Sequence, residues 1–192
     1  DPAGEPFAAL RLADLAAPHL ERLRFRYPQP ELSYALTPWL LVHLLARGFE
    51  RVLFLKQETL VLEPLGSLFD RPGPAAIPLT PHLPEPLDGS SQAGEAAARE
   101  REILLAGVYN AGVLGVARSA VTRRFLAWWG ERLSRHSLRA VEAGMHFEQR
   151  WLDFVPSLFP PVAIDRRPGS NLGHWRLPES RIEERRGRLL VD

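Results

Sequence analysis

Two periodicities of apolar residues run along the chain, one typical of helices and one typical of buried strands. Apolar residues at helical spacing predict a helix over residues 12–25, which the Pro-rich segment 27–30 is expected to stop. A second helix is expected over residues 31–47, starting afresh near Pro38 and ending at the C-cap residue Gly48. Because this second helix has little polar face, we expect it to be buried on most sides.

Short, continuous apolar runs predict the strands of a sheet. Residues 51–55 form such a run, which is typical of a strand covered on both faces in a parallel or mixed sheet. After three polar residues, residues 59–62 are expected to continue it. Four later runs also fit strands, the last of them an edge strand: residues 75–79, 113–117, 162–164 and 188–191.

Helices and loops are expected between these strands. A short helix over residues 64–69 and a loop over residues 84–94 precede an amphipathic helix from Ser119 to about residue 135. A last helix is expected around residues 147–159, followed by an irregular loop over residues 168–178. Strands that alternate with helices indicate an α/β sandwich, and 192 residues of which 45% are apolar fit one compact domain.

Composition argues against several classes of protein. The formal net charge of +1 comes from 24 basic and 23 acidic residues spread along the chain, so we expect no nucleic-acid partner. Without cysteine, any metal would need oxygen or imidazole ligands. No apolar run reaches the roughly 18 residues of a membrane span, so we expect a soluble, cytoplasmic protein. The first residues show neither an initiator Met nor a signal-peptide pattern, which fits a chain cropped at its start.

The only lysine of the chain, Lys56, lies at the end of the expected strand 51–55. It opens a polar tripeptide, Lys-Gln-Glu, that interrupts the apolar run. In open α/β sheets, ligands bind outside the carboxyl ends of the strands. This position therefore predicts a binding site around Lys56.

Six polar or Pro-containing segments occur in an order that is more specific than any one of them. They are residues 31–38, residues 52–62, Leu79-Thr80-Pro81-His82, Tyr109-Asn110-Ala111-Gly112, residues 148–153 (Glu-Gln-Arg-Trp-Leu-Asp) and Pro168-Gly169-Ser170-Asn171. Together they resemble the bacterial GT-A-fold glycosyltransferases akin to glycosyltransferase family 8, over nearly the whole chain from about Leu20 to Leu190. Where that family has Lys-Pro, Asp-x-Asp and Asp-Gln, this chain has Thr37-Pro38, Lys56-Gln57-Glu58 and Glu148-Gln149.

The resemblance implies a GT-A-like α/β fold, in which helices flank a mixed sheet. It implies transfer of a hexose from a nucleotide sugar to a glycan or small acceptor, with retention of configuration. Two parts of such enzymes have no counterpart here: the first strand and loop, which hold the nucleotide base, and a His-containing segment after the last strand. We therefore expect either a fragment or a degenerate member. The rival hypothesis is a catalytically inactive member that binds a sugar or a protein partner.

In the family, the two aspartates of the Asp-x-Asp motif hold a divalent cation, Mn²⁺ or Mg²⁺, which neutralises the leaving diphosphate. Lys56 and Glu58 occupy these positions, so Glu58 alone of the pair could ligate a metal. Three interpretations stay open. Lys56 replaces the cation as a fixed positive charge for phosphate, catalysis is lost and Lys56 is merely solvated, or Glu58 binds metal with residues outside this chain.

The resemblance also assigns residues to the sugars. Asn110, Ala111 and Gly112 are expected to form a turn that faces them, although Asn-Ala-Gly is also a common ordinary turn. Glu148 and Gln149 would lie under the donor sugar, where they could steady positive charge growing on the anomeric carbon. A glutamate favoured at a helix N-terminus is the alternative explanation for Glu148.

Loop residues complete the predicted site. Thr80 and His82 would border the acceptor, and Trp175, which follows Asn171 in an irregular loop, would be a platform for a sugar ring. The tryptophans at positions 128, 129 and 151 have the spacing of core residues instead. His82, His146 and His174 lie too far apart in the sequence to predict a metal site.

Overall fold

The computed structural model describes residue 4 and residues 6–69, 77–87 and 93–191. Its centre is a four-stranded sheet of order β1-β3-β2-β6, built from β1 (Arg51–Leu55), β3 (Tyr109–Ala117), β2 (Ile77–Pro81) and β6 (Val162–Ile164). β3 is antiparallel to both β1 and β2, whereas β2 and β6 are parallel. Consequently β1, β2 and β6 share one direction, and their carboxyl ends lie together at the end of the sheet where β3 begins.

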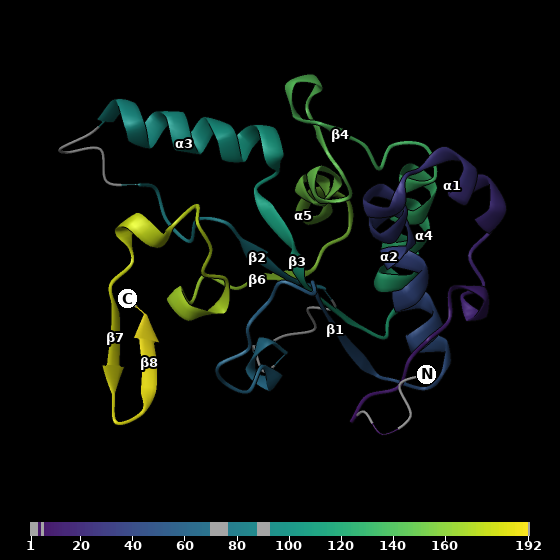
Figure 1. Ribbon diagram of the computed structural model, residues 1–192, viewed down its shortest axis with the longest axis horizontal. Helices are drawn as coiled ribbons and strands as arrows, with labels where there is room; N and C mark the ends of the chain where they lie inside the picture. Colours follow the sequence, from purple (N-terminus) through teal and green to yellow (C-terminus); the bar gives the residue numbers. More distant parts are fainter. Residues whose placement is uncertain (1–3, 5, 70–76, 88–92, 192) are drawn as a thin grey trace.

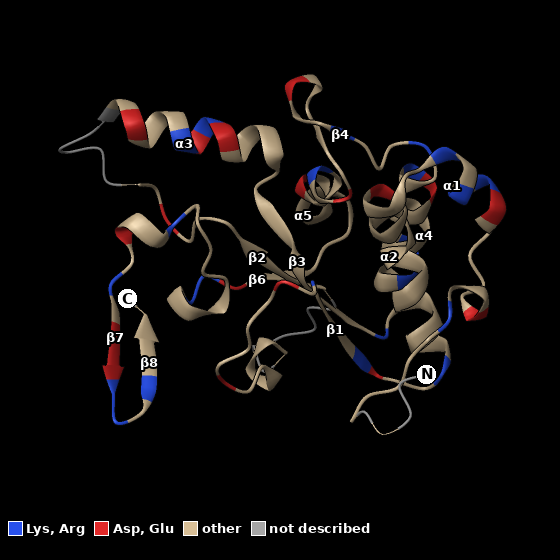
Figure 2. Ribbon diagram, viewed as in Figure 1, with Lys and Arg blue, Asp and Glu red and all other residues tan. Residues whose placement is uncertain are grey.

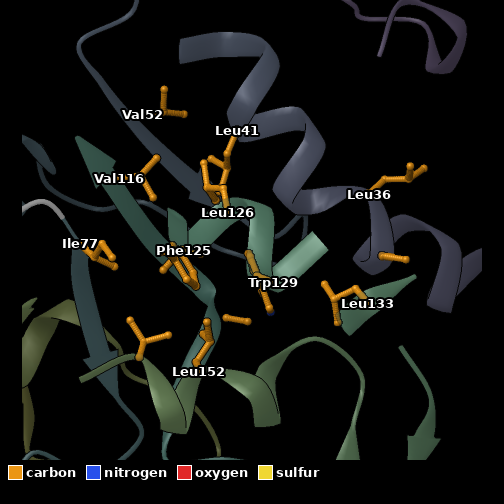
Figure 3. Close-up of a cluster of buried hydrophobic side chains, with 14 of the residues drawn as sticks. Leu36, Leu41, Val52, Ile77, Val116, Phe125, Leu126, Trp129, Leu133 and Leu152 are labelled. Atoms are coloured by element: carbon orange, nitrogen blue, oxygen red, sulfur yellow. The ribbon is translucent and has the colours of Figure 1, made fainter. Parts of the chain in front are cut away.

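Three helices cover one side of this sheet (Figure 1): α1 (Leu20–Arg26), α2 (Gln29–Ala46) and α4 (Ala120–Leu133). Side chains of α4, among them Phe125, Leu126 and Trp129, are fully buried between α2 and the sheet (Figure 3). Ser119 starts α4, because its hydroxyl accepts a hydrogen bond from the backbone N–H of Thr122. The amphipathic pattern expected from Ser119 onward is thus confirmed.

Helices α2 and α4 run antiparallel and close together. Near one end, the ring of Trp39 lies over Gly130, where an added Cβ would come within 2.7 Å of the indole. Near the other end, the Arg118 guanidinium donates to the carbonyl oxygens of Leu45 and Phe49 at 2.5 and 3.2 Å. These bonds tie the start of α4 to the last turn of α2 and to the segment that follows it.

The remaining elements are short, apart from one helix. Helix α3 (Ala93–Ala106) projects beside the sheet and carries charges of both signs, whereas the strands of the sheet are almost free of charge (Figure 2). The others are α5 (Val155–Leu158), the strand pairs β4 (Arg139–Ala140) with β5 (Met145–His146) and β7 (Ile182–Arg185) with β8 (Arg188–Val191), and the 3-10 helices η1 (Leu12–Asp14), η2 (Gly66–Leu68), η3 (Val141–Ala143), η4 (Gln149–Phe154), η5 (Pro168–Ser170) and η6 (Leu177–Glu179).

Proline explains both differences between the expected and observed N-terminal helices. The helix predicted over residues 12–25 is broken, since only η1 and α1 form and His19, which follows Pro18, has a left-handed φ of 57°. By contrast, α2 does not restart at Pro38 but continues through it. Leu36, Thr37 and Leu41 around this proline are all buried. Packing therefore compensates for the backbone hydrogen bond that Pro38 cannot donate.

The strand expected to be covered on both faces is in fact at an edge of the sheet. β1 pairs only with β3, and of its residues only Val52 is buried. Residues 59–62 do not extend it, because the chain turns away after Lys56 and leaves Leu60 80% exposed. The most completely buried strand is β2, in which all five residues are buried. The expected residues 75 and 76 at its start lie outside the described residues.

Other predictions hold in type but not in extent. β3 begins four residues earlier than expected, α3 starts inside the predicted loop, and residues 147–159 form η4 and α5 instead of one helix. The closing strand β8 pairs with β7 in a separate hairpin, not with the main sheet. The described helices include none that is long and apolar enough to cross a membrane. The fold is therefore mixed α/β, with a mixed sheet and flanking helices.

Candidate polar site at the carboxyl end of the sheet

Three segments distant in the sequence meet where β1 and β2 end and β3 begins. Lys56 follows β1 directly, and its backbone N–H donates to the carbonyl of Gly112 on β3 at 3.0 Å. His82 follows β2 directly, and its backbone N–H donates to the carbonyl of Val108 at 2.9 Å. Lys56 and His82 thus both lie at the end of the sheet where open α/β sheets bind ligands.

The ammonium of Lys56 is held between a carboxylate and an aromatic ring. Its Nζ lies 3.0 Å from Oε1 of Glu148, with the Lys56 side chain 14% exposed and the Glu148 side chain 0% exposed. On another side, Nζ lies 4.3 Å from the centroid of the Tyr34 ring. The two contacts neutralise and partly desolvate the lysine. Lys56 is therefore not simply a solvated charge at a strand end.

Glu148 is the most deeply buried charged group near this lysine. Burial raises the pKa of its carboxyl, whereas the positive charge of Lys56 acts in the opposite direction. Neither carboxylate oxygen accepts a well-aligned hydrogen bond among the described residues, so the charge contact with Lys56 is what compensates Glu148. Because both side chains are largely buried, the charge of each is compensated mainly by the other. Removing either partner would leave the remaining charge buried and unpaired.

Gln149 fixes the start of β3 rather than facing open space. Its Oε1 accepts from the N–H of Ala111 at 3.2 Å, and its Nε2 donates to the carbonyl of Ala106 at 3.1 Å. The same Nε2 lies 3.4 Å from Nδ1 of His146. Gly107, with a φ of 117°, permits this approach, since an added Cβ would lie 3.2 Å from Cγ of Gln149.

Asn110 and Asn171 bridge β3 to the loop that contains η5. Nδ2 of Asn110 donates to Oδ1 of Asn171 at 2.8 Å, and Nδ2 of Asn171 donates to the carbonyl of Pro81 at 3.0 Å. Oδ1 of Asn110 accepts from the N–H of Gly112 at 2.7 Å. Asn110, Ala111 and Gly112 lie within β3, so the expected turn at these residues is wrong.

Two histidines in this region have a pKa below the ordinary value for the side chain. Burial lowers the pKa of His82 to about 4, although the ring contacts the carbonyl of Val108 at 3.2 Å. Burial and then the charges of Lys56 and Arg139 lower the pKa of His146. His82 and His146 are far apart in the sequence but close together in the fold. Both lie near enough to Lys56 for its positive charge to lower their pKa values.

Trp175 packs edge-on against His82, with ring centroids 4.7 Å apart. Its ring rests on Gly173, where an added Cβ would lie 2.3 Å from the indole. The buried Nε1 of Trp175 has no hydrogen-bond partner among the described residues. The face of the indole that rests on Gly173 is therefore closed to a sugar, and a platform could only use the opposite face.

Thr80 and Glu58 differ from the other predicted site residues. Thr80 is buried within β2, and its hydroxyl donates to the carbonyl of Val113 at 3.0 Å, so it ties two strands together. Glu58 is exposed and lies near enough to raise the pKa of Glu148 by repulsion. Among the described residues, no group of three or more His, Cys, Asp or Glu side chains could hold a metal ion.

The sequence predictions missed Tyr34, His146 and Asp165. Asp165 directly follows β6, so the same carboxyl-end rule would have found it. It is buried and forms a bidentate ion pair with Arg167, whose Nη1 also donates to Ser67. Burial acts to raise the pKa of Asp165, but the Arg167 and Ser170 side chains hold it below its usual value. Tyr34 gave no such signal, because it is one side chain on a long apolar helix.

Comparison with known proteins gives one partial likeness. No protein-family model matches the chain, and no solved structure matches it. The uncharacterized protein YfnF of Bacillus subtilis (strain 168) is 31% identical over 88 residues. These residues are 46% of this chain and 29% of YfnF, so the match spans less than a third of that protein. A likeness of this extent defines no family for the chain.

Proposed function

We propose that this chain is a GT-A-like glycosyltransferase domain, which transfers a hexose from a nucleotide sugar to a glycan or small acceptor. The observation that carries the proposal is the meeting of four residues that lie far apart in the sequence. Lys56, Asn110, Glu148 and Asn171 were each assigned to a sugar or phosphate site by the resemblance, and their contacts bring them to one end of one sheet. Ligands of open α/β sheets bind at this end.

The cluster offers distinct groups for the two halves of a nucleotide sugar. The amides of Asn110 and Asn171 are partly exposed and can exchange their mutual hydrogen bond for bonds to sugar hydroxyls. The ammonium of Lys56 can act as a point charge for phosphate, where it would compete with Glu148 for the same cation. Catalysis would then depend on positioning and on charge stabilisation of the leaving diphosphate.

A divalent cation, which the family resemblance implies, does not fit the donors that the described part of the chain brings to this site. At the first of the two motif positions stands an ammonium, which repels a cation. The carboxylate nearest to it, Glu148, is already paired with that ammonium, and Glu58 alone supplies an exposed carboxylate at the motif. We therefore propose a site that works without metal and derive no step through one.

A second candidate is a catalytically inactive glycosyltransferase-like protein that binds a sugar or a protein partner. The observation in its favour is the complete burial of Glu148. A carboxylate with no exposed surface cannot reach a substrate without a rearrangement. In this second case the Lys56–Glu148 pair would serve the fold alone, and the amides of Asn110 and Asn171 would bind the ligand.

The test measures nucleoside diphosphate release from a panel of nucleotide sugars, together with calorimetric titration of nucleoside diphosphates in EDTA. Release that persists in EDTA and falls at least tenfold in Lys56→Met supports the enzyme. Lys56→Arg keeps the charge, and the exposed Arg124→Met is the matched control on α4. Glycan-dependent thermal stabilisation without release supports the binding protein. No release, no diphosphate binding and no response to glycans would refute the enzyme and the sugar-binding protein alike.

A further inference from the structure

A groove between α2 and α4 lies at the opposite end of the sheet from the polar site. Its volume is about 370 Å³, and nine residues line it. On the α2 side the lining residues are Trp39, Val42, Leu45 and Ala46, all of them apolar. Val42 keeps 39% of its surface exposed. The expectation that α2 is buried on most sides therefore fails along this strip.

The groove lies beside the contact between the two helices at Trp39 and Gly130. Trp39 closes one end by resting on Gly130. Beyond that contact, α4 contributes Leu126 and the small Ala127, which leave space next to α2. The groove then runs to the start of α4 at Ser119. Most of its lining is apolar, and it lies between two helices that pack against each other (Figure 1).

Two arginines line the part of this groove near the start of α4. Arg118 lines it but is already engaged, since its guanidinium pairs with Glu50 at 2.9 Å and bonds the carbonyls at the end of α2. Arg123 also lines it and is exposed. Its guanidinium has no ion pair or hydrogen bond within the part of the chain that the structure describes. Arg123 is thus a cation available to a ligand.

We propose that this groove binds a single-chain fatty acid, with the hydrocarbon tail along α2 and the carboxylate on Arg123. The volume lies within the range of about 300–1,000 Å³ found for small-molecule sites. A largely apolar groove with an available arginine in its lining matches an apolar chain that ends in an anion. The guanidinium fork also bonds a carboxylate with two parallel hydrogen bonds. This site is independent of the polar site and of its proposed function.

Size and charge favour a fatty acid over a protein that would cover the same strip. A stable protein interface engages about 20–30 residues on each side, whereas nine residues line the groove. A second copy of this chain, docked on the same face, would add its own Arg118 and Arg123 to an interface that already holds these two arginines. Like charges facing each other oppose such a pairing.

The test is calorimetric titration of the full chain with decanoate below its micelle concentration. We expect saturable binding of one decanoate per chain, with decanol and decyltrimethylammonium bound at least tenfold more weakly. Arg123→Gln should weaken decanoate binding about tenfold, the loss expected when one charge-assisted contact is removed. Ala127→Trp, which fills the groove from an exposed position, should abolish it. Arg124→Gln, the adjacent exposed arginine outside the groove, is the matched control and should bind normally.

Four results would overturn the proposal. They are no decanoate binding, equal binding of decanol, equal losses in Arg123→Gln and Arg124→Gln, and unchanged binding in Ala127→Trp. Sedimentation of the same variants provides a further test. A dimer of the wild-type chain that Ala127→Trp dissociates would show that a second copy covers the groove, and this too would refute a fatty-acid site.

Discussion

The two ends of the central sheet differ in which side chains they bury and which they expose. At the end where β1 and β2 finish, charged and amide side chains are pulled inward and paired with one another, as Lys56 is with Glu148. At the other end, the apolar strip of α2 stays open while the charges of Arg118 and Arg123 stand at the rim. β3, whose nine residues span about 30 Å, runs from one region to the other. A buried charge is stable only when another group of the same protein compensates it, whereas an exposed apolar surface is typical of a site that binds another molecule.

The largest expected effect comes from breaking the buried pair. Lys56→Met leaves Glu148 buried without a counter-charge, and we expect a loss of about 3 kcal/mol in the free energy of unfolding at pH 7. Urea denaturation measures it. The double variant Lys56→Met, Glu148→Leu should recover most of the loss, because it removes both charges. A single variant as stable as the wild type would show that the pair contributes nothing.

The polar end should also make stability depend on pH. His82 has a pKa of about 4 in the fold against 6.5 when free, so its contribution is full above pH 6.5 and is lost as the pH falls toward 4. This amounts to about 2 kcal/mol between pH 7 and pH 5. Burial raises the pKa of Glu148 and acts in the opposite sense, favouring the fold as the pH falls. Urea denaturation at the two pH values should show a smaller loss in His82→Gln, and an equal loss would exclude His82 as its source.

The apolar end should respond to packing rather than to charge. Gly130→Ala would place a Cβ 2.7 Å from the Trp39 ring and push α2 and α4 apart. We expect a net loss of about 1 kcal/mol, since the strain exceeds the gain in helix propensity. Thermal unfolding and decanoate titration of the same variant measure the loss and any change in the groove. Gly94→Ala on α3, where an added Cβ meets nothing within 4 Å, is the control and should be neutral or stabilising.

The smallest expected effect separates the two contacts of Lys56. Tyr34→Leu removes the ring 4.3 Å from Nζ but leaves Glu148 in place, so we expect a loss of about 0.5–1 kcal/mol. Tyr34→Phe keeps the ring and should be close to the wild type. Chemical denaturation of both variants separates the contribution of the Tyr34 ring to the free energy of unfolding from that of its hydroxyl. Equal losses in the two would assign the effect to the hydroxyl and remove the cation–π contact from the description of the site.

Local signals in the sequence predicted the elements of the fold better than their arrangement. The apolar run before Lys56 and the serine that starts α4 were sufficient, because strand and helix signals act within a few residues. The carboxyl-end rule indicated a site at Lys56, whereas His82 was assigned to that site by the family resemblance. The resemblance assigned Glu148 and Lys56 to one site, but their direct ion pair could not be predicted, since it depends on how the segment before η4 crosses the start of β3.

What the sequence determined by itself is the set of short-range choices: where chains of apolar residues form strands, where Ser119 begins a helix, and that polar groups follow β1 and β2. Only the tertiary structure decided that β1 lies at an edge, that Glu148 is sealed against Lys56, and that one strip of α2 stays open above Arg123. Burial and pairing are properties of neighbours brought together by the whole fold, and sequence separation carries little information about them.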